Sequence, residues 1–280
     1  MTLHRTFCLL MFAALLGGAR PTPGQQSFLG RVRGQNTAMT AVQPGWLTPL
    51  VEADPRLVQY TRWSFSNEYT PLRTETTSYG NARGTGFIIG NRYELDIAQP
   101  TYVQHNGAST DGFGDTGTQG KVRIVSGNGD HGNYILTAMV NHTFATGSHS
   151  NGALTDTWAP TLAGGVGVGK RFALESALGG VMPTGKIATQ GRSIGWNSLV
   201  QARLAGPVRV EFEDNATVYF AGSHDGKMQN FVTPAAFYIL RLKSWKPTRP
   251  FYIFDSGMQI ATSGFHTYNH NLISEVRILF

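Results

Sequence analysis

The chain has 280 residues and a formal net charge of +6, and only 14% of its residues are charged, against roughly 25% in an average soluble domain. Its mean hydropathy is −0.17, and beyond the first residues no stretch approaches the ~18 consecutive apolar residues of a membrane-spanning helix. These values argue against a typical soluble domain and against a helical membrane protein. They are typical of a β-barrel in which lipid-facing and lumen-facing residues alternate.

Residues 1–19 have the pattern of a secretory signal peptide. Arg5 precedes the apolar run from Phe7 to Leu16, and the small residues 17–19 provide a cleavage site. The alternative is a buried N-terminal helix. The only cysteine, Cys8, lies within the apolar run, so cleavage would leave no cysteine for a disulfide bond or a metal site.

Residues 20–55 are rich in proline, glycine and glutamine, so we expect an irregular periplasmic segment there and not a folded domain. From residue 56 onward the chain changes to short segments with period-2 alternation, separated by turn residues. This pattern predicts an all-β fold over 56–280, a transmembrane antiparallel up-and-down barrel. The twelve predicted strands are 56–68, 83–90, 93–104, 112–126, 133–145, 161–172, 174–183, 194–205, 208–221, 230–243, 249–262 and 270–280.

The predicted connections alternate between short and long. Asn91-Arg92 and Gly206-Pro207 are tight turns, whereas 69–82, 146–160 and 184–193 are long and polar. Short turns at one end and long loops at the other are typical of outer-membrane barrels, and an even strand number places both termini in the periplasm. A soluble β-sandwich is the alternative fold with many strands.

Charged residues fall on one face of several predicted strands. In 208–213, for example, Val208, Val210 and Phe212 share one face, whereas Arg209 and Glu211 share the other. Placing a charge in hydrocarbon would cost about 2–4 kcal/mol at the bilayer midplane, so the charged face is expected to line the lumen. We predict a ladder of lumenal ion pairs; the alternative is a set of solvated charges on a soluble sheet. The predicted lumen-lining residues are Arg62, Glu94, Asp96, Asp115, Lys121, Arg123, Arg203, Arg209, Glu211, Glu213, Glu275 and Arg277.

The last predicted strand ends on the final residue, Phe280. Leu272, Val276, Ile278 and Phe280 share its lipid face, with Glu275 and Arg277 on the opposite face. An apolar face that ends in an aromatic residue resembles the C-terminal signal read by the barrel-assembly machinery. Closure of the barrel would bring Glu275 and Arg277 beside Arg62.

Four features resemble the MetA-pathway phenol-degradation family of bacterial outer-membrane proteins. They are the run 90–97 followed by Pro100, Phe113-Gly114-Asp115 followed by 121–123, the step 182–185, and the aromatic C-terminus. The resemblance covers roughly 56–280. It implies a barrel that passes small hydrophobic or aromatic compounds, and it supplies no catalytic residues.

One short run raises the alternative of an enzyme. Residues 147–152 resemble the His-x-Ser-Asn-Gly run of outer-membrane phospholipase A. A base and a nucleophile two positions apart share one face of a strand, but Ser148 and Ser150 each adjoin His149 and would point to the face opposite it. We therefore expect no catalytic residues. The remaining histidines show no metal-ligand spacing, so no metal or cofactor is expected.

Together these patterns predict a porin-like outer-membrane protein of a Gram-negative bacterium, exported by its signal peptide. The leading hypothesis is a passive channel or uptake conduit for a small solute that the sequence does not identify. The alternatives are an outer-membrane lipid hydrolase and a closed barrel with a structural or interaction role. The expected partners are outer-membrane lipids and the barrel-assembly machinery. The basic charge is spread along the chain, so no nucleic acid is expected.

Overall fold

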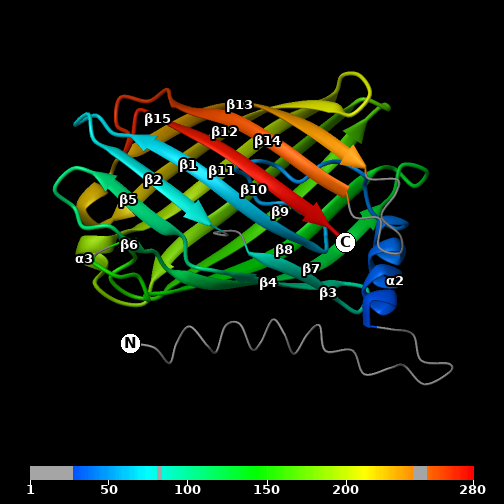
Figure 1. The fold of residues 1–280 in the computed structure, drawn as a ribbon, viewed down its shortest axis with the longest axis horizontal. Coiled ribbons are helices and arrows are strands. Elements are labelled where there is room, and N and C mark those ends of the chain that lie inside the picture. Colours follow the sequence, from blue (N-terminus) through cyan, green and yellow to red (C-terminus); the bar gives the residue numbers. More distant parts are fainter. Residues whose placement is uncertain (1–27, 81–83, 150, 242–250) are drawn as a thin grey trace.

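A computed structural model describes residues 28–80, 84–149, 151–241 and 251–280. The predicted signal peptide, 1–19, lies outside these residues. The described chain forms one closed antiparallel sheet (Figure 1). Its strands are β1 (Tyr60–Tyr69), β2 (Glu75–Gly80), β3 (Thr85–Ile89), β4 (Tyr93–Ala98), β5 (Tyr102–Asn106), β6 (Gly112–Phe113), β7 (Thr116–Gly127), β8 (Tyr134–Phe144), β9 (Thr157–Val168), β10 (Phe172–Pro183), β11 (Arg192–Arg203), β12 (Val208–Ala221), β13 (Met228–Arg241), β14 (Phe251–Ala261) and β15 (His270–Leu279).

The chain runs along the height of the barrel twelve times, so the wall has twelve antiparallel crossings. Strands β2 and β3 both pair with β1, so together they form one crossing next to it. On its other side β2 pairs with β5 and β3 pairs with β4, so β4 and β5 together form the next crossing. Strand β6 pairs with β5 and β7 pairs with β4, which makes a third divided crossing. The break between β4 and β5 contains Pro100, which has no amide hydrogen to donate to a neighbouring strand. The predicted twelve-stranded up-and-down barrel is confirmed.

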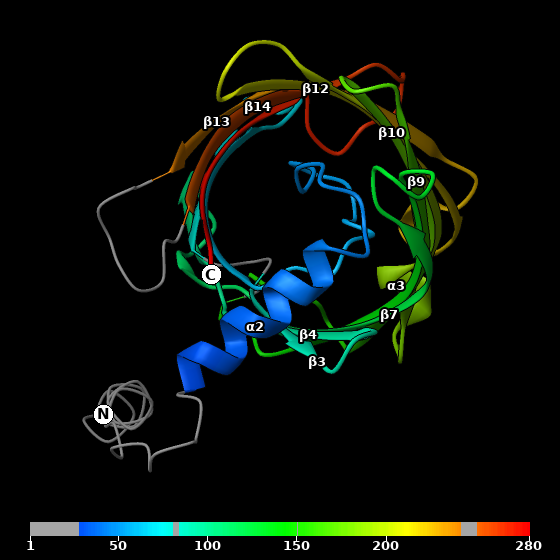
Figure 2. The same ribbon diagram turned by 90° about the vertical axis from the view of Figure 1, so that its right-hand side faces the viewer.

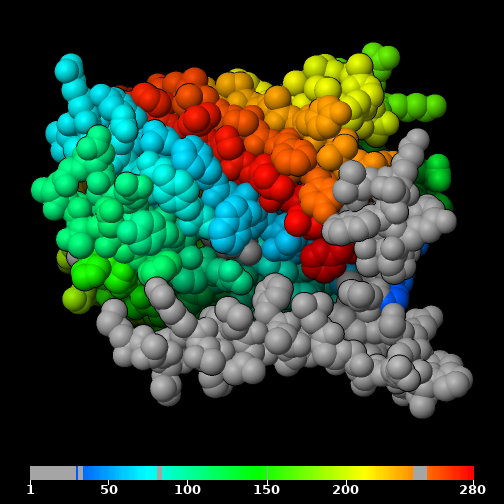
Figure 3. All heavy atoms as spheres, viewed as in Figure 1, coloured from blue at the N-terminus to red at the C-terminus, as the bar shows by residue number. Residues whose placement is uncertain are grey.

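The barrel closes between its first and last strands. Strand β15 pairs with β1 along its whole length, from Tyr60 opposite Leu279 to Tyr69 opposite His270. Figure 3 shows this side of the wall, where the cyan atoms of β1 lie against the red atoms of β15. Strand β15 ends at Leu279, one residue before the predicted end at Phe280.

Connections at the two ends differ in length, as predicted. One end, which we call the turn end, carries the connections 90–92, 128–133, 169–171 and 204–207. The other, the loop end, carries longer connections and the short helices α3 (Ile187–Gln190) and η1 (Gly222–His224). Some strand boundaries were predicted wrongly. Strands were predicted over 161–172 and 174–183, with only Ala173 between them, but β9 ends at Val168 and the turn to β10 is 169–171. The predicted loop 69–82 contains β2.

The outer wall is apolar and the inner wall is polar, because side chains alternate along each strand. On β12, Phe212 is 46% exposed, whereas Glu211 and Glu213 on either side of it are buried. Trp63 and Trp196 are also on the exposed face. Among the described residues, no helix combines the length and the apolar character needed to cross a membrane.

The N-terminal segment enters the barrel. Helix α2 (Phe28–Thr40) lies across the turn end, and the chain that follows it runs into the lumen (Figure 2). We call residues 41–59 the plug. The segment 20–55, predicted to be irregular, is irregular only in part: residues 28–40 form helix α2, and the chain after it bonds with side chains inside the barrel. Helix α2 ends four residues before Pro44, and the position before a proline disfavours helical geometry.

Apolar side chains of the plug form a core with the barrel wall. Leu47 and Leu50 pack with Phe237 of β13 and Ile253 of β14, and all four are buried. A glycine in the wall makes room for this contact: a Cβ atom at Gly257 would lie 2.6 Å from Cδ2 of Leu50. The core of the molecule is therefore inside the lumen.

We predict that Gly257→Ala unseats the plug. The added methyl group overlaps with Leu50, and overpacking of this kind costs about 1–3 kcal/mol. Trypsin cleavage after the buried Arg56 should accelerate about tenfold or more in detergent-solubilised protein. The matched control is Gly120→Ala, because a Cβ atom there meets nothing within 4 Å. Equal cleavage rates in the two variants would contradict the prediction.

Candidate functional site

The lumen and the plug inside it form the candidate site. The plug has almost no regular structure, so its backbone groups must find partners outside a helix or sheet ladder. Charged side chains of the wall provide many of them.

Two arginines at the barrel seam bind carbonyl groups of the plug. Arg62 of β1 donates from Nη2 to the carbonyl oxygen of Leu50 at 2.7 Å and to that of Pro49 at 3.3 Å. Arg277 of β15 donates from Nη2 to Pro49 at 3.0 Å and from Nη1 to the carbonyl of Thr48. Three successive carbonyl groups are thus held by two guanidinium groups.

Two carboxylates stabilise these neighbouring cations. Arg62 and Arg277 lie directly opposite each other in the sheet, a destabilising arrangement for like charges. Glu275 forms an ion pair with both, 3.1 Å from Nη2 of Arg277, and Asp255 of β14 lies 2.8 Å from Nε of Arg277. All four side chains are buried, so charge balance here is a condition for burial.

Two carboxylates of β12 bind amide groups of the plug. Glu211 accepts from the backbone N–H of Leu50 at 3.0 Å. Glu213, which is 0% exposed, accepts from Val51 and Glu52, each at 2.7 Å. Each such hydrogen bond contributes about 0.5–1.5 kcal/mol net, and an unpaired buried amide would cost about 1–3 kcal/mol.

Gln201 of β11 extends this contact toward the turn end. Its side-chain oxygen accepts from the N–H of Leu47 at 2.9 Å, and its Nε2 donates to the carbonyl of Leu47 at 3.3 Å. Nε2 also donates to Glu211 at 3.0 Å. We call the contacts of Arg62, Arg277, Glu211, Glu213 and Gln201 with residues 47–52 the clamp.

The plug also stabilises its own loop. Gln43 and Leu57 exchange two hydrogen bonds, which closes the loop between them. Arg56 forms an ion pair with Asp54 at 3.0 Å and donates to Thr48 Oγ1 at 2.8 Å. Burial alone would raise the pKa of the Asp54 carboxyl, but the charges of Arg56 and Lys121, with hydrogen bonds from Arg56 and Thr48, lower that pKa to about 2.

The other predicted lumen residues differ in whether they form ion pairs. Lys121 lies 2.6 Å from Glu94 and 3.6 Å from Asp96, all three buried, as the predicted ladder requires. Arg123 has no carboxylate beside it among the described residues; it donates to Met39 Sδ at 2.8 Å and to the carbonyl of Asn91 at 2.6 Å.

Three further predicted lumen residues lie at the barrel ends. Asp115 is at the loop end, where its carboxylate accepts from the amides of Thr146, Gly147 and Ala153 and so holds the β8–β9 loop. Arg203 and Arg209 are paired in register at the turn end. Among the predicted lumen residues, the ion pairs that the structure describes are those of Lys121 with Glu94 and Asp96 and those of Glu275 with Arg62 and Arg277.

Sequence reasoning missed two buried lumenal acids. Asp255 follows the exposed Phe254, and Glu175 follows the exposed Leu174, so the same period-2 alternation would have found both. Glu175 is 3% exposed, and neither of its carboxyl oxygens has a hydrogen-bond partner among the described residues. No comparable signal marks the plug.

A second constriction forms at the loop end. The connection 262–269 carries Tyr268, whose ring stacks on Phe231 with 4.3 Å between centroids. The Tyr268 hydroxyl donates to the side chain of Gln259, a buried lumenal residue of β14, at 2.6 Å. The lumen is thus narrowed by the plug from one end and by a loop from the other.

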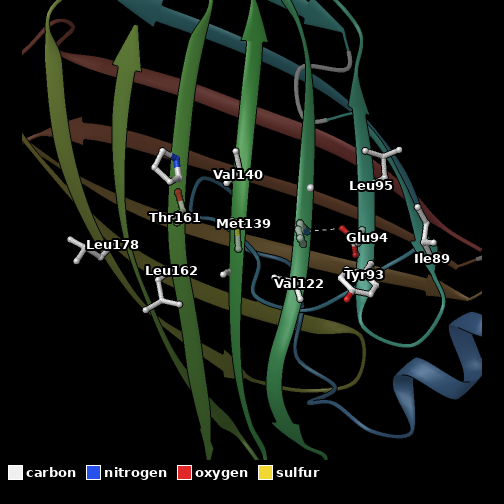
Figure 4. A pocket seen from close by; sticks show the side chains of 14 residues that line it. Ile89, Tyr93, Glu94, Leu95, Val122, Met139, Val140, Thr161, Leu162 and Leu178 are labelled. Carbon is white, nitrogen blue, oxygen red and sulfur yellow. Dashed lines mark ion pairs between the residues drawn. The ribbon is translucent and has the colours of Figure 1, made fainter. Parts of the chain in front are cut away.

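Two hollows adjoin the wall. A cavity of about 920 Å³ opens at the turn end, between the plug and the ends of β9 to β14. A shallower apolar hollow of about 830 Å³ lies on the outer wall, where Gly120 and Ala138 present little side-chain volume. Figure 4 shows Leu162 and Leu178 at its rim and, as a dashed line, the ion pair of Glu94. This second hollow is on the apolar outer face of the barrel.

The predicted alternative of a lipid hydrolase gains no geometric support from the described residues. His149 lies in the β8–β9 loop with a φ of 52° and makes no side-chain hydrogen bond to any described residue. Ser148 Oγ accepts from the amide of Phe113 at 2.8 Å, and Ser150 lies outside the described residues. Within the described ranges, no group of three or more histidine, cysteine, aspartate or glutamate side chains could hold a metal ion.

Comparisons with known proteins agree with the barrel architecture. No protein-family model matches the chain, and no curated protein matches its sequence. Among solved structures, the chain is similar to the COG4313 outer membrane channel from Pseudomonas putida F1, with a TM-score of 0.55 and 13% identity over 84% of this chain and 100% of that one. It is also similar to the NanC porin, with a TM-score of 0.50 and 7% identity over 79% of this chain and 98% of that one.

Its structural neighbours are outer-membrane channel and porin barrels. At these identities the likeness shows a shared fold. Any statement about transport must come from the lumen of this chain.

We predict that Glu213→Gln loosens the plug. The amide side chain loses the charge and one acceptor, so the two hydrogen bonds from Val51 and Glu52 weaken together. Hydrogen exchange of these two amides, followed by NMR in detergent, should accelerate about tenfold or more. The control is Glu75→Gln, an exposed residue of β2 at the loop end; similar acceleration in both variants would argue against the clamp.

We predict that the plug stays seated from pH 7 to about 4 and loosens as the pH falls toward 2. The pKa of Asp54 is lowered from 3.8 to about 2. The stability that its carboxylate gives to the seated plug is therefore fully present above pH 3.8, the pKa of the free group, and is lost as the pH falls through about 2, the pKa in the folded protein. In Asp54→Asn the plug should be less protected than wild type at pH 7 and equally protected at pH 2. The hydrogen-exchange protection factor of the Leu57 amide, which donates to Gln43, measures this at each pH, and an unchanged difference across the range would contradict it.

Proposed function

We propose that the protein is an outer-membrane channel for small solutes, whose lumen is closed by the plug and opens when the plug moves. One observation carries the proposal: a chain segment inside a closed barrel is held by hydrogen bonds between its backbone and polar or charged side chains of the wall, beside a small apolar contact. Such contacts can be exchanged for contacts with water when a segment leaves, since water satisfies the same donors and acceptors.

The proposed orientation follows from the two ends. The loop end faces the outside and the turn end faces the periplasm, as in other outer-membrane barrels. The signal peptide, 1–19, would direct export, and the apolar residues Leu272, Val276, Ile278 and Phe280 would be read by the barrel-assembly machinery. Outer-membrane lipids would cover the exposed apolar wall. The solved neighbours, an outer membrane channel and a porin, support this location.

The proposed solute is small and polar. The middle of the lumen carries Lys121, Glu94, Arg62 and Arg277 with their partners, and its apolar residues are occupied in packing against the plug. We also propose membership of the MetA-pathway phenol-degradation family on the motifs given above. That membership would favour an aromatic solute, whereas the charged wall favours a polar one.

The channel can be tested by locking the plug. Leu47 and Gln201 exchange two hydrogen bonds, so Leu47→Cys with Gln201→Cys places two thiols at this contact. In planar bilayers we expect stepwise conductance from the reduced double variant, and its loss on oxidation. Gln201→Cys alone is the control and should not respond to oxidant.

Two outcomes would count against the proposal. Absence of any conductance from wild type and from the reduced variant would favour a closed barrel with a structural role. Equal conductance before and after verified disulfide formation would show that the solute path does not require movement of the plug.

A further inference from the structure

Six basic side chains line the cavity at the turn end. Arg56 of the plug is paired with Asp54, and the five that belong to the barrel wall are Lys170, Arg171, Arg203, Arg209 and Arg241. They come from the β9–β10 turn and from the ends of β11, β12 and β13, so neighbouring segments of the wall present them to one space. The one acidic residue lining the cavity is Asp130, on the β7–β8 turn. The cavity is therefore strongly positive.

None of these five cations has an ion-pair partner in the part of the chain that the structure describes. The sequence makes this informative, because all 17 aspartate and glutamate residues lie within the described ranges. Arg203 and Arg209 face each other in register, and the charges of Arg203 and Arg241 both act on Arg209. Like charges placed opposite each other destabilise a sheet, so this arrangement has a cost that no side-chain carboxylate of this protein offsets.

Two of the arginines are held in place by the chain itself. Nη1 of Arg209 donates to the carbonyl groups of Gly206 at 3.0 Å and Val208 at 2.8 Å. The guanidinium carbon of Arg241 lies 5.9 Å from the centroid of the Phe251 ring. A guanidinium group oriented in this way still has donors to offer, and its planar fork matches carboxylate and phosphate oxygens.

We propose that this cavity is a binding site for a small, multiply charged anion with carboxylate or phosphate groups. Its volume of about 920 Å³ is within the range of small-molecule sites, which is roughly 300–1,000 Å³. The site is concave and lies inside the mouth of the barrel, against Gln43 and Trp46 of the plug, which suits a small molecule better than a protein surface. Binding here does not require the barrel to conduct, so the inference stands or falls separately from the channel.

The test is direct binding to the purified full-length protein in a non-ionic detergent. Isothermal titration with citrate and with pyrophosphate serves as the probe, and we expect saturable binding that weakens as salt is added. In Arg203→Gln with Arg209→Gln the affinity should fall at least tenfold. The matched control is Arg73→Gln with Arg192→Gln, which removes the same charge from exposed positions at the loop end and should change the affinity less than twofold.

Two checks keep the result decisive. Heat-modifiable gel migration verifies that each variant is folded, and Arg203→Lys with Arg209→Lys, which keeps the charge but loses the planar fork, should bind with intermediate affinity. A second titration in micelles containing phosphatidylglycerol distinguishes a soluble anion from a lipid headgroup. Undiminished citrate binding there supports the proposal. Its abolition would assign the site to a headgroup and overturn the soluble ligand, as would absence of binding or an equal loss in both double variants.

Discussion

The structure depends on hydrogen bonds to the backbone amides and carbonyls of the plug, which are buried in the lumen but belong to no helix or sheet. The plug lies in the lumen as an irregular chain, and each unpaired amide or carbonyl there would carry a penalty. The wall meets this demand by chemical type: arginines bind the carbonyls of 48–50, and glutamates bind the amides of 50–52. The charges of the lumen are thus recognition groups for a peptide.

This role explains why the charges are distributed as they are. A ladder of ion pairs between strands would need only matched signs on adjacent strands. The described lumen has such pairs between Lys121 and Glu94 and at the β1–β15 seam. Glu211 and Glu213 of β12 form no ion pair among the described residues and instead bind amide groups of the plug. Glycines complete the fit, since Gly165 and Gly257 leave the volume that Trp46 and Leu50 occupy. The wall therefore complements the plug both in shape and in hydrogen-bonding groups.

The barrel could be predicted from the sequence because apolar and polar residues alternate within each strand. The alternation of Phe212 with Glu211 and Glu213 is local, and so is the alternation that places Glu175 and Asp255 inside. The plug has no such period. Its place depends mainly on contacts with residues far away in the sequence, such as Leu50 with Glu211, 161 positions apart, and Thr48 with Arg277, 229 positions apart. A segment positioned mainly by distant partners cannot be located by a local pattern.

The clamp has a consequence for the order in which the molecule is made. Arg62 belongs to the first strand and Arg277 to the last, and the plug contacts both, while the amide of Phe280 bonds to Gln59 at the plug's end. The receptor for the plug is therefore complete only after the two edges of the sheet have met. The full set of contacts that holds the plug can form only when β1 and β15 are paired, so a fully seated plug is a sign that the barrel has closed.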